Sequence, residues 1–332
     1  MANAQHLHDQ GRSVFEFTNN SSVPHGRPHT LLFIAGLNDG LPTVPYVEHI
    51  AKALKPTKWS LFWVQLSSAY GAWGTSSLSK DIGEIFKCIN FIRDLRKMRS
   101  PHEEHGKMVL MGHSTGCQDI LYYLTDTKSG CRGDINPTVP LASRRVLDGA
   151  ILQAPVSDRE ELHMNLRRSQ NPHDAWATYH QLVSLAMSQP PLELLPLAMT
   201  TKMGFTLDTP FNGYRFLSIA SPESPGSPSD DDMFSSDLPD AALAKTFGRV
   251  SACGKLKGQL LVLYSECDEY VPSEVDKRAL MQRWERATNA GGEQKWDPES
   301  GLIPGAIHNV EFHGQDWLIA RVHGYLQRVE RG

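Results

Sequence analysis

Hydrophobic and polar residues follow two different periods along most of this chain. Short apolar runs that stop at a glycine, such as TLLFIAG (residues 30–36) and KMVLMG (residues 107–112), predict strands buried on both faces. Apolar residues that return every three or four positions, most regularly over residues 79–98, predict amphipathic helices. Further strands are expected at residues 13–18, 59–66, 146–155 and 259–266, and further helices at residues 44–54, 117–126, 273–288 and 316–329. Because strands and helices alternate, we expect an α/β fold with a mostly parallel central sheet and helices on both faces.

The alternation stops between residues 155 and 249. Helical stretches in this segment are separated by PP, TPFNG and PESPGSPSDDD, so we expect an inserted helical cap rather than more sheet. Residues 221–232 are rich in Ser, Pro, Gly and Asp, a composition that predicts a mobile surface loop. The expected organisation is a core made of residues 1–154 and 250–332, with residues 155–249 forming the cap.

Charge and composition exclude several classes of protein. The 332 residues include 33 Lys and Arg against 37 Asp and Glu, a net charge of −4 without the basic excess of a nucleic-acid-binding protein. No apolar window is long enough for a membrane span. Five widely spaced cysteines without a C-x-x-C pair, and an N-terminus unlike a signal peptide, favour free thiols and a cytoplasmic protein. PHEEH (residues 101–105) lacks the spacing of H-E-x-x-H, so we expect neither a metal nor another cofactor.

A serine stands at the end of one predicted strand. The strand at residues 107–112 continues into GHSTG, which contains Ser114, and a predicted helix follows at once. Strand, G-x-S-x-G and helix is the context in which this motif forms a nucleophile elbow. The flanking glycines permit a sharp turn that exposes the serine hydroxyl, and the N-terminus of the following helix offers N–H groups to an oxyanion. Ser114 is therefore the candidate nucleophile.

A serine nucleophile needs a base, and the base needs an acid that orients it. In this kind of fold the chain order is Ser, then Asp or Glu, then His. Asp268 follows a late predicted strand and is the candidate acid, with Glu266 and Glu269 as alternatives. His308 precedes the last predicted helix and is the candidate base. His313, closer to that helix, is the alternative.

Two further sets of residues are candidates for contacts with a substrate. The oxyanion hole needs a second N–H from the loop after the first long buried strand. We expect it to combine the backbone N–H groups of Leu37 and Thr115, with that of Asn38 as the next choice. For side-chain contacts to the substrate we expect Tyr70, Trp73 and, in the cap, Trp176.

The motifs together resemble a known group of enzymes. Over about residues 10–330 the chain is similar to the α/β-hydrolase superfamily. GHSTGCQDI, FIAGLNDG, SSAYGAWGTSSLSKD and SECDEYVP resemble a mainly fungal siderophore esterase family of the fusarinine C esterase type. The resemblance implies an α/β-hydrolase fold, Ser114, Asp268 and His308 as catalytic residues, and a hydroxamate siderophore as a small-molecule ester substrate that is cleaved inside the cell to release its iron.

Other functions fit the same residues. A general carboxylesterase, a thioesterase or an acyltransferase would use the same three side chains, because the cap selects the leaving group and the acceptor. A non-catalytic binding protein of this fold is the alternative outside the enzymes. Ala35-Gly36 replaces the His-Gly of lipases, which argues against a triglyceride lipase.

Overall fold

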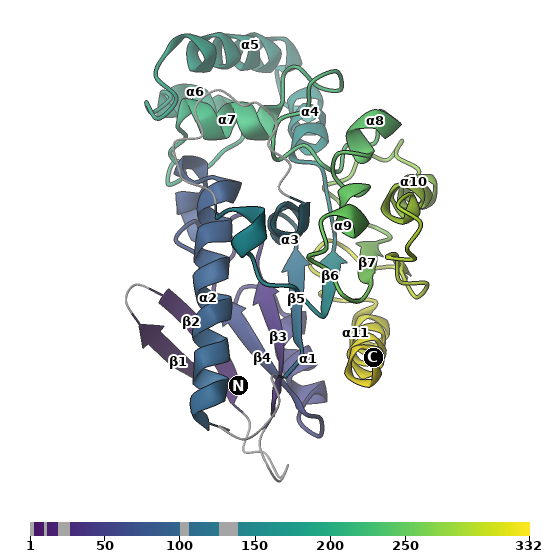
Figure 1. Cartoon of the computed structure of the whole chain (residues 1–332). Helices are drawn as coiled ribbons and strands as arrows, with labels where there is room; N and C mark the ends of the chain where they lie inside the picture. Colours follow the sequence, from purple (N-terminus) through teal and green to yellow (C-terminus); the bar gives the residue numbers. More distant parts are fainter. Residues whose placement is uncertain (1–2, 10–11, 19–26, 100–105, 126–138) are drawn as a thin grey trace.

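One mixed sheet runs through the molecule (Figure 1). The computed structural model describes residues 3–9, 12–18, 27–99, 106–125 and 139–332. Within these residues eight strands pair in the order β1-β2-β4-β3-β5-β6-β7-β8. The strands are β1 (Asn3–Asp9), β2 (Arg12–Thr18), β3 (His29–Ile34), β4 (Trp59–Val64), β5 (Met108–His113), β6 (Gly149–Gln153), β7 (Leu260–Ser265) and β8 (Gly301–Ile303). β2 runs antiparallel to β1 and β4, and the remaining pairs are parallel. The prediction of a mostly parallel sheet is confirmed.

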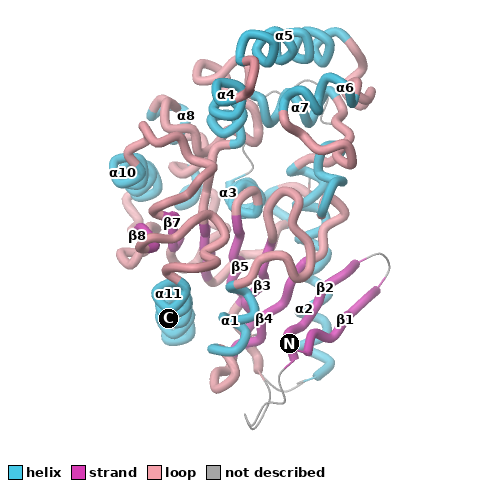
Figure 2. Tube along the Cα trace, turned by 180° about the vertical axis from the view of Figure 1, so that it is seen from behind, coloured by secondary structure: helices cyan, strands magenta, loops and turns pink. Residues whose placement is uncertain are grey.

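Helices cover both faces of the sheet, as the alternating pattern predicts. On one face lie α2 (Leu78–Arg99), α3 (Gly116–Thr125) and α10 (Lys277–Asn289), and on the other lie α1 (Tyr46–Ala53) and α11 (Gln315–Arg331) (Figures 1 and 2). β4, β5, β6 and β7 are buried along their whole length, which is why they appear in the sequence as continuous apolar runs. β1 and β8 were not predicted. β1 (NAQHLHD) has no continuous apolar run and is held in the sheet by its pairing with β2. β8 (GLI) has only three residues and pairs with β7.

The segment between β6 and β7 contains helices and no strand, and all of it is described. Its elements are α4 (Asp158–Arg168), α5 (Pro172–Ser188), α6 (Leu197–Thr200), the 3₁₀ helix η3 (Thr201–Met203), α7 (Gly213–Ala220), α8 (Asp240–Leu243) and α9 (Arg249–Ala252). α4 to α7 lie beyond the ends of β5 and β6, next to the start of α3 (Figure 1). The first turns of α4, α5 and α7 each donate a backbone N–H hydrogen bond to the side chain of the preceding residue, which is Ser157, Asn171 and Asn212 respectively.

Packing divides this segment into two parts. Residues from α4 to α7, among them Leu162, Leu182 and Phe216, form a separate apolar cluster, which Trp73 joins from the core part of the chain. After α7, Phe234 and Phe247 join the large cluster on one face of the sheet. Both rings pack on Trp284 of α10, with centroids 5.6 and 5.2 Å from the tryptophan ring. Only the part up to α7 therefore has a core separate from that of the sheet.

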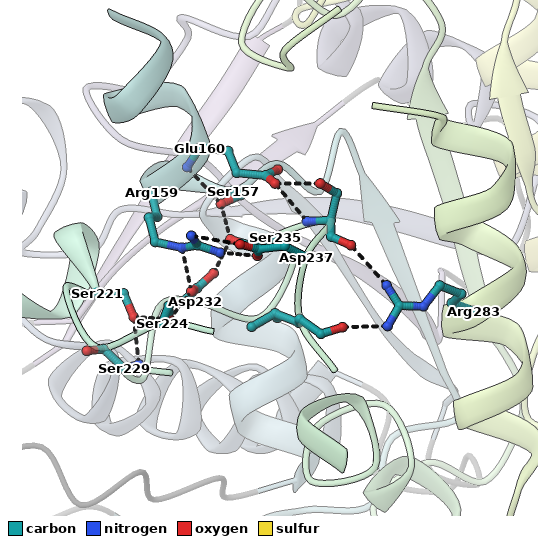
Figure 3. Close-up of polar contacts among 12 residues, drawn as sticks. Ser157, Arg159, Glu160, Ser221, Ser224, Ser229, Asp232, Ser235, Asp237 and Arg283 are labelled. Atoms are coloured by element: carbon teal, nitrogen blue, oxygen red, sulfur yellow. Dashed lines mark hydrogen bonds and ion pairs between the residues drawn. The ribbon is translucent and has the colours of Figure 1, made fainter. Parts of the chain in front are cut away.

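The aspartates of residues 221–232 are buried, which corrects the expectation of an acidic surface loop. Asp231 accepts two hydrogen bonds from Arg215 Nη1, at 2.7 and 2.8 Å. Asp232 accepts one from Arg159 Nε at 2.9 Å, within the polar network of Figure 3. Composition alone suggested a solvated segment, because it does not reveal that two arginines from α4 and α7 neutralise these carboxylates.

Candidate active site

Three glycines shape the turn that presents Ser114. Ser114 lies between β5 and α3 with a backbone φ of 53°, in the left-handed region that few residues other than glycine adopt. A Cβ on Gly112 would lie 2.2 Å from the carbonyl oxygen of Gly116, and one on Gly116 would lie 2.4 Å from that of Ile34. A Cβ on Gly36, in the facing loop, would lie 2.6 Å from Ser114 Cβ. No side chain fits at these positions, so the glycines allow the sharp turn that GHSTG predicts.

Asp268 and His308 come from the ends of neighbouring strands. Asp268 follows β7, and His308 lies in the loop between β8 and α11. Both side chains are buried, and His308 Nδ1 lies 2.8 Å from Asp268 Oδ2. Because a carboxylate can only accept, this contact places the proton of a neutral imidazole on Nδ1 and leaves Nε2 with its lone pair.

The alternative acids and base take other positions. Glu269 Oε2 accepts a hydrogen bond of 2.9 Å from the backbone N–H of His308, and Glu266 Oε2 accepts one of 2.9 Å from the backbone N–H of Gly305. Both carboxylates thus hold the loop rather than the imidazole. His313 is exposed to solvent. The geometry favours Asp268 and His308.

Ser114 and His308 line one cavity of about 330 Å³ between the sheet edge and the inserted segment. Its floor includes Leu37, and its roof includes Met203 and Phe205. The volume lies in the range of small-molecule sites. In this structure no hydrogen bond joins Ser114 to His308, both of which belong to the described residues. Catalytic hydrogen bonds commonly tighten only when substrate binds.

His113, Gln153 and Asn309 form a support that sequence reasoning missed. His113 Nδ1 lies 2.5 Å from Gln153 Oε1, and His113 Nε2 lies 3.2 Å from Asn309 Oδ1. Gln153 Nε2 donates to the backbone carbonyl of His308 at 3.3 Å. A polar residue at the end of the buried run GAILQ was the available signal. The three side chains connect the end of β5 to the loop that carries His308.

His113 stays neutral at physiological pH. Burial lowers the pKa of His113 to about 4, and a positive charge on His308 would act in the same direction. Since both of its ring nitrogens also face protein side chains, His113 is poorly suited to accept a proton from Ser114. This leaves His308 as the better candidate base.

The backbone N–H groups of Leu37 and Thr115 are available to a ligand. Neither donates a hydrogen bond to any residue within the described ranges. Leu37 lines the cavity and Thr115 directly follows Ser114, at the N-terminus of α3. Asn38 also lines the cavity, with a backbone φ of 62°, and its Oδ1 accepts a hydrogen bond of 2.8 Å from Trp73 Nε1. Both N–H groups lie in the loops that flank Ser114 and remain the candidates for the oxyanion hole.

One of the three side chains expected to contact substrate lines the cavity. Trp73 does so. Tyr70 instead lies over Gly40, is 49% exposed, and donates from its hydroxyl to the carbonyl of Leu41 at 3.1 Å. Trp176 packs within the inserted segment, with its ring centroid 5.4 Å from that of Tyr179. Tyr70 and Trp176 are not among the residues that line the cavity, because each is held by packing elsewhere.

The side chains around the cavity carry more acid than base. Asp39, Asp158 and Glu161 line it, and none of the lining residues in the described chain is Lys or Arg. Burial raises the pKa of Glu161 to about 7 and that of Asp158 well above its usual range. Near neutral pH, Glu161 is therefore divided between its protonated and its ionised form.

This shift predicts a pH-dependent effect of Glu161→Gln on stability. In the unfolded chain Glu161 ionises near pH 4.5, whereas in the folded protein it ionises near pH 7. Its ionisation therefore destabilises the fold increasingly between these two pH values, and by a constant amount above them. The Tm of Glu161→Gln minus that of the wild type should rise from pH 4.5 to 7 and then level off. Thermal unfolding measured in pH steps checks this, with Glu193→Gln, an exposed glutamate of the same segment, as control. A difference that does not change with pH would contradict the assignment.

No group of three or more His, Cys, Asp or Glu residues in the described ranges is arranged to hold a metal ion. PHEEH, residues 101–105, lies outside those ranges. None of the described helices is both long and apolar enough to span a membrane.

The sheet order and the strained serine turn define the class of protein: the chain has the α/β-hydrolase fold. Est1E from Butyrivibrio proteoclasticus has this fold with a TM-score of 0.54 at 12% identity, over 99% of each chain. Residues 1–327 match the family model described as "Protein of unknown function (DUF1749)", and the chain belongs to that family.

Proteins with higher sequence identity to this chain have names that state an enzymatic activity. The chain is 41% identical to "Fusarinine C esterase sidJ" from Aspergillus fumigatus over 340 residues, which cover 98% of this chain and 95% of that protein. It is 42% identical to "Esterase AN6793" from Emericella nidulans over 350 residues, covering 96% and 90%. The solved structure of "Siderophore hydrolase EstB from Aspergillus fumigatus" is similar with a TM-score of 0.85 and 40% identity, over 100% of this chain and 99% of that chain. The resemblance to siderophore esterases seen in the motifs is confirmed.

Proposed function

We propose that this protein is a serine esterase that hydrolyses the ester bonds of a hydroxamate siderophore of the fusarinine C type. The observation that carries the proposal is a single cavity shared by the hydroxyl of Ser114 and the imidazole of His308, whose other nitrogen is held by buried Asp268. The names of two relatives at 40% and 41% identity support the choice of substrate.

In the first half of the reaction, Ser114 Oγ attacks the ester carbonyl while His308 Nε2 takes its proton. The N–H groups of Leu37 and Thr115 donate to the oxyanion, and Asp268 stabilises the imidazolium that forms. When the tetrahedral intermediate collapses, His308 protonates the departing alkoxide. The products of this half are a free alcohol and an acyl group bound to Ser114.

In the second half, water enters the cavity and His308 takes one of its protons. The resulting hydroxide attacks the acyl carbon, the same two N–H groups hold the second oxyanion, and Ser114 leaves with the proton from His308. The net reaction adds one water to one ester. No step requires a group that the chain itself lacks, and any iron enters as part of the substrate.

The inserted segment acts as the cap in this proposal. α4 to α7 have their own apolar cluster and supply the roof of the cavity, so they select the substrate while the sheet edge supplies the chemistry. We also propose a cytoplasmic location, because Cys117, Cys253 and Cys267 in the described chain are free thiols.

Incubation with fusarinine C tests the substrate directly. The purified protein should convert both the iron-loaded and the iron-free compound to products that gain the mass of one water for each ester cleaved, as read by mass spectrometry. Boiled protein and Ser114→Ala serve as controls. Rapid turnover of short-chain esters with an intact siderophore would replace this proposal with that of a general carboxylesterase.

A further inference from the structure

A small recess lies behind the oxyanion turn, next to the catalytic cavity. Its volume is about 20 Å³, and it shares Leu37 and Trp73 with the cavity. Its other walls include Thr115 of the turn, Asp119 of α3 and Arg215 of α7. The recess therefore lies where the serine turn of the core meets the inserted segment.

Three residues that line the recess each carry a buried polar atom without a hydrogen-bond partner. The atoms are Thr115 Oγ1, Asp119 Oδ1 and Arg215 Nε. The residues are only 4%, 2% and 1% exposed. An unpaired buried polar group costs about 1–3 kcal/mol, so three in one place call for a shared partner. The ion pair of Arg215 with Asp231 uses Nη1 and leaves the Nε–H group free to donate.

The three atoms define the chemistry of that partner. It must accept from Arg215 Nε and form a hydrogen bond of either direction with Thr115 Oγ1 and with the carboxyl group of Asp119. A cation in the recess would be repelled by the guanidinium of Arg215. An anion would meet the oxygen atoms of the carboxyl groups of Asp119 and Asp81, which are unfavourable neighbours for a negative charge. Burial raises the pKa of Asp119 well above its usual range, which further reduces the negative charge that a cation would need. A neutral molecule with both donors and acceptors satisfies all three atoms.

We propose that the recess binds one ordered water molecule that connects Arg215, Asp119 and Thr115. A volume of about 20 Å³ is enough for one water, which needs about 10–15 Å³ and two to four polar partners.

This water positions the oxyanion turn, and this part of the inference depends on the proposed function. Thr115 supplies a backbone N–H to the oxyanion, and its side chain is fixed through the water to Arg215, which α7 of the inserted segment carries. A donor displaced by a fraction of an ångström stabilises the transition state less well. Thr115 Oγ1 thus acts as a positioning group that couples the placement of the cap to the chemistry at Ser114.

A crystal structure of the wild type at high resolution tests the binding site. We expect one water peak about 2.6–3.2 Å from Thr115 Oγ1, Asp119 Oδ1 and Arg215 Nε. An empty recess, or density that refines as an ion, overturns the proposal. This result does not depend on whether the protein hydrolyses a siderophore, so it separates the failure of the water site from the failure of the proposed function.

Thr115→Val tests the positioning role, because it removes the hydroxyl and keeps the shape of the side chain. We expect kcat to fall about tenfold with little change in KM, and Thr115→Ser to recover most of the loss. Thr125→Val is the matched control. It removes another buried hydroxyl of α3, one that donates to the Leu121 carbonyl far from the recess, and should leave kcat within about twofold of the wild type. A normal kcat in Thr115→Val, or no recovery in Thr115→Ser, would refute the coupling even if the water is present.

Discussion

Ser114→Ala should reduce ester hydrolysis by about 10⁵-fold and leave the protein folded. The loss follows because the proposed reaction proceeds through a bond between Ser114 Oγ and the acyl carbon, and alanine has no atom that can form it. A fluorophosphonate probe, which reacts with activated serines, should label the wild type and not the variant. Labelling is read by intact mass, and activity by product formation from fusarinine C.

The fold should tolerate this change. Ser114 Oγ makes no hydrogen bond with a residue of the described chain, so its removal leaves no buried partner unsatisfied. Alanine at position 114 must adopt the same positive φ of 53°. Because this backbone conformation is strained for alanine too, we expect a modest decrease in Tm. A folded variant that retains wild-type turnover, or a wild type that the probe does not label, would eliminate the acyl-enzyme. The second result would favour a non-catalytic binding protein.

Asp268→Asn should lower kcat by about 10³–10⁴-fold. Asparagine has nearly the same shape, but its amide group can donate to His308 Nδ1. The neutral imidazole would then carry its proton on Nε2, where it cannot accept the proton of Ser114. The neutral amide also no longer stabilises the imidazolium. Steady-state kinetics should show the loss in kcat, with KM changed far less, because substrate binding does not depend on Asp268.

Glu269→Gln is the matched control for this prediction. Glu269 Oε2 accepts a hydrogen bond from the backbone N–H of His308, and glutamine retains an oxygen for that bond. We therefore expect less than about a tenfold loss of kcat. If Glu269→Gln lost as much activity as Asp268→Asn, the orienting acid would not be a single residue. If only Glu269→Gln were impaired, the assignment of Asp268 would be wrong.

Local sequence was enough to predict six of the eight described strands and the turn at Ser114. Strands buried on both faces need continuous apolar runs, and a tight turn needs glycines at fixed positions, so both leave signals within a few residues. β1 escaped because its pairing with β2, rather than an apolar face, holds it in place. The order of Ser114, Asp268 and His308 along the chain was informative for the same reason, since Ser114 and Asp268 follow predicted strands and His308 precedes the last predicted helix.

Features that depend on partners distant in sequence could not be predicted. Asp231 and Asp232 looked solvated until the structure paired them with Arg215 and Arg159, 16 and 73 residues away. Gln153 reaches His308 across 155 residues. The directions of Tyr70 and Trp176 depend on tertiary packing in the same way, and neither faces the cavity.

The cavity has a floor and a roof that come from different parts of the chain, and this separation has a consequence for how such enzymes diversify. Glu161, Met203 and Phe205 of the roof can be exchanged without disturbing the glycines and the buried histidine–aspartate contact beneath them. A library confined to these roof positions would explore new ester substrates while keeping the reaction itself intact. Directed evolution of this protein should therefore begin with these roof positions and leave the residues around Ser114 unchanged.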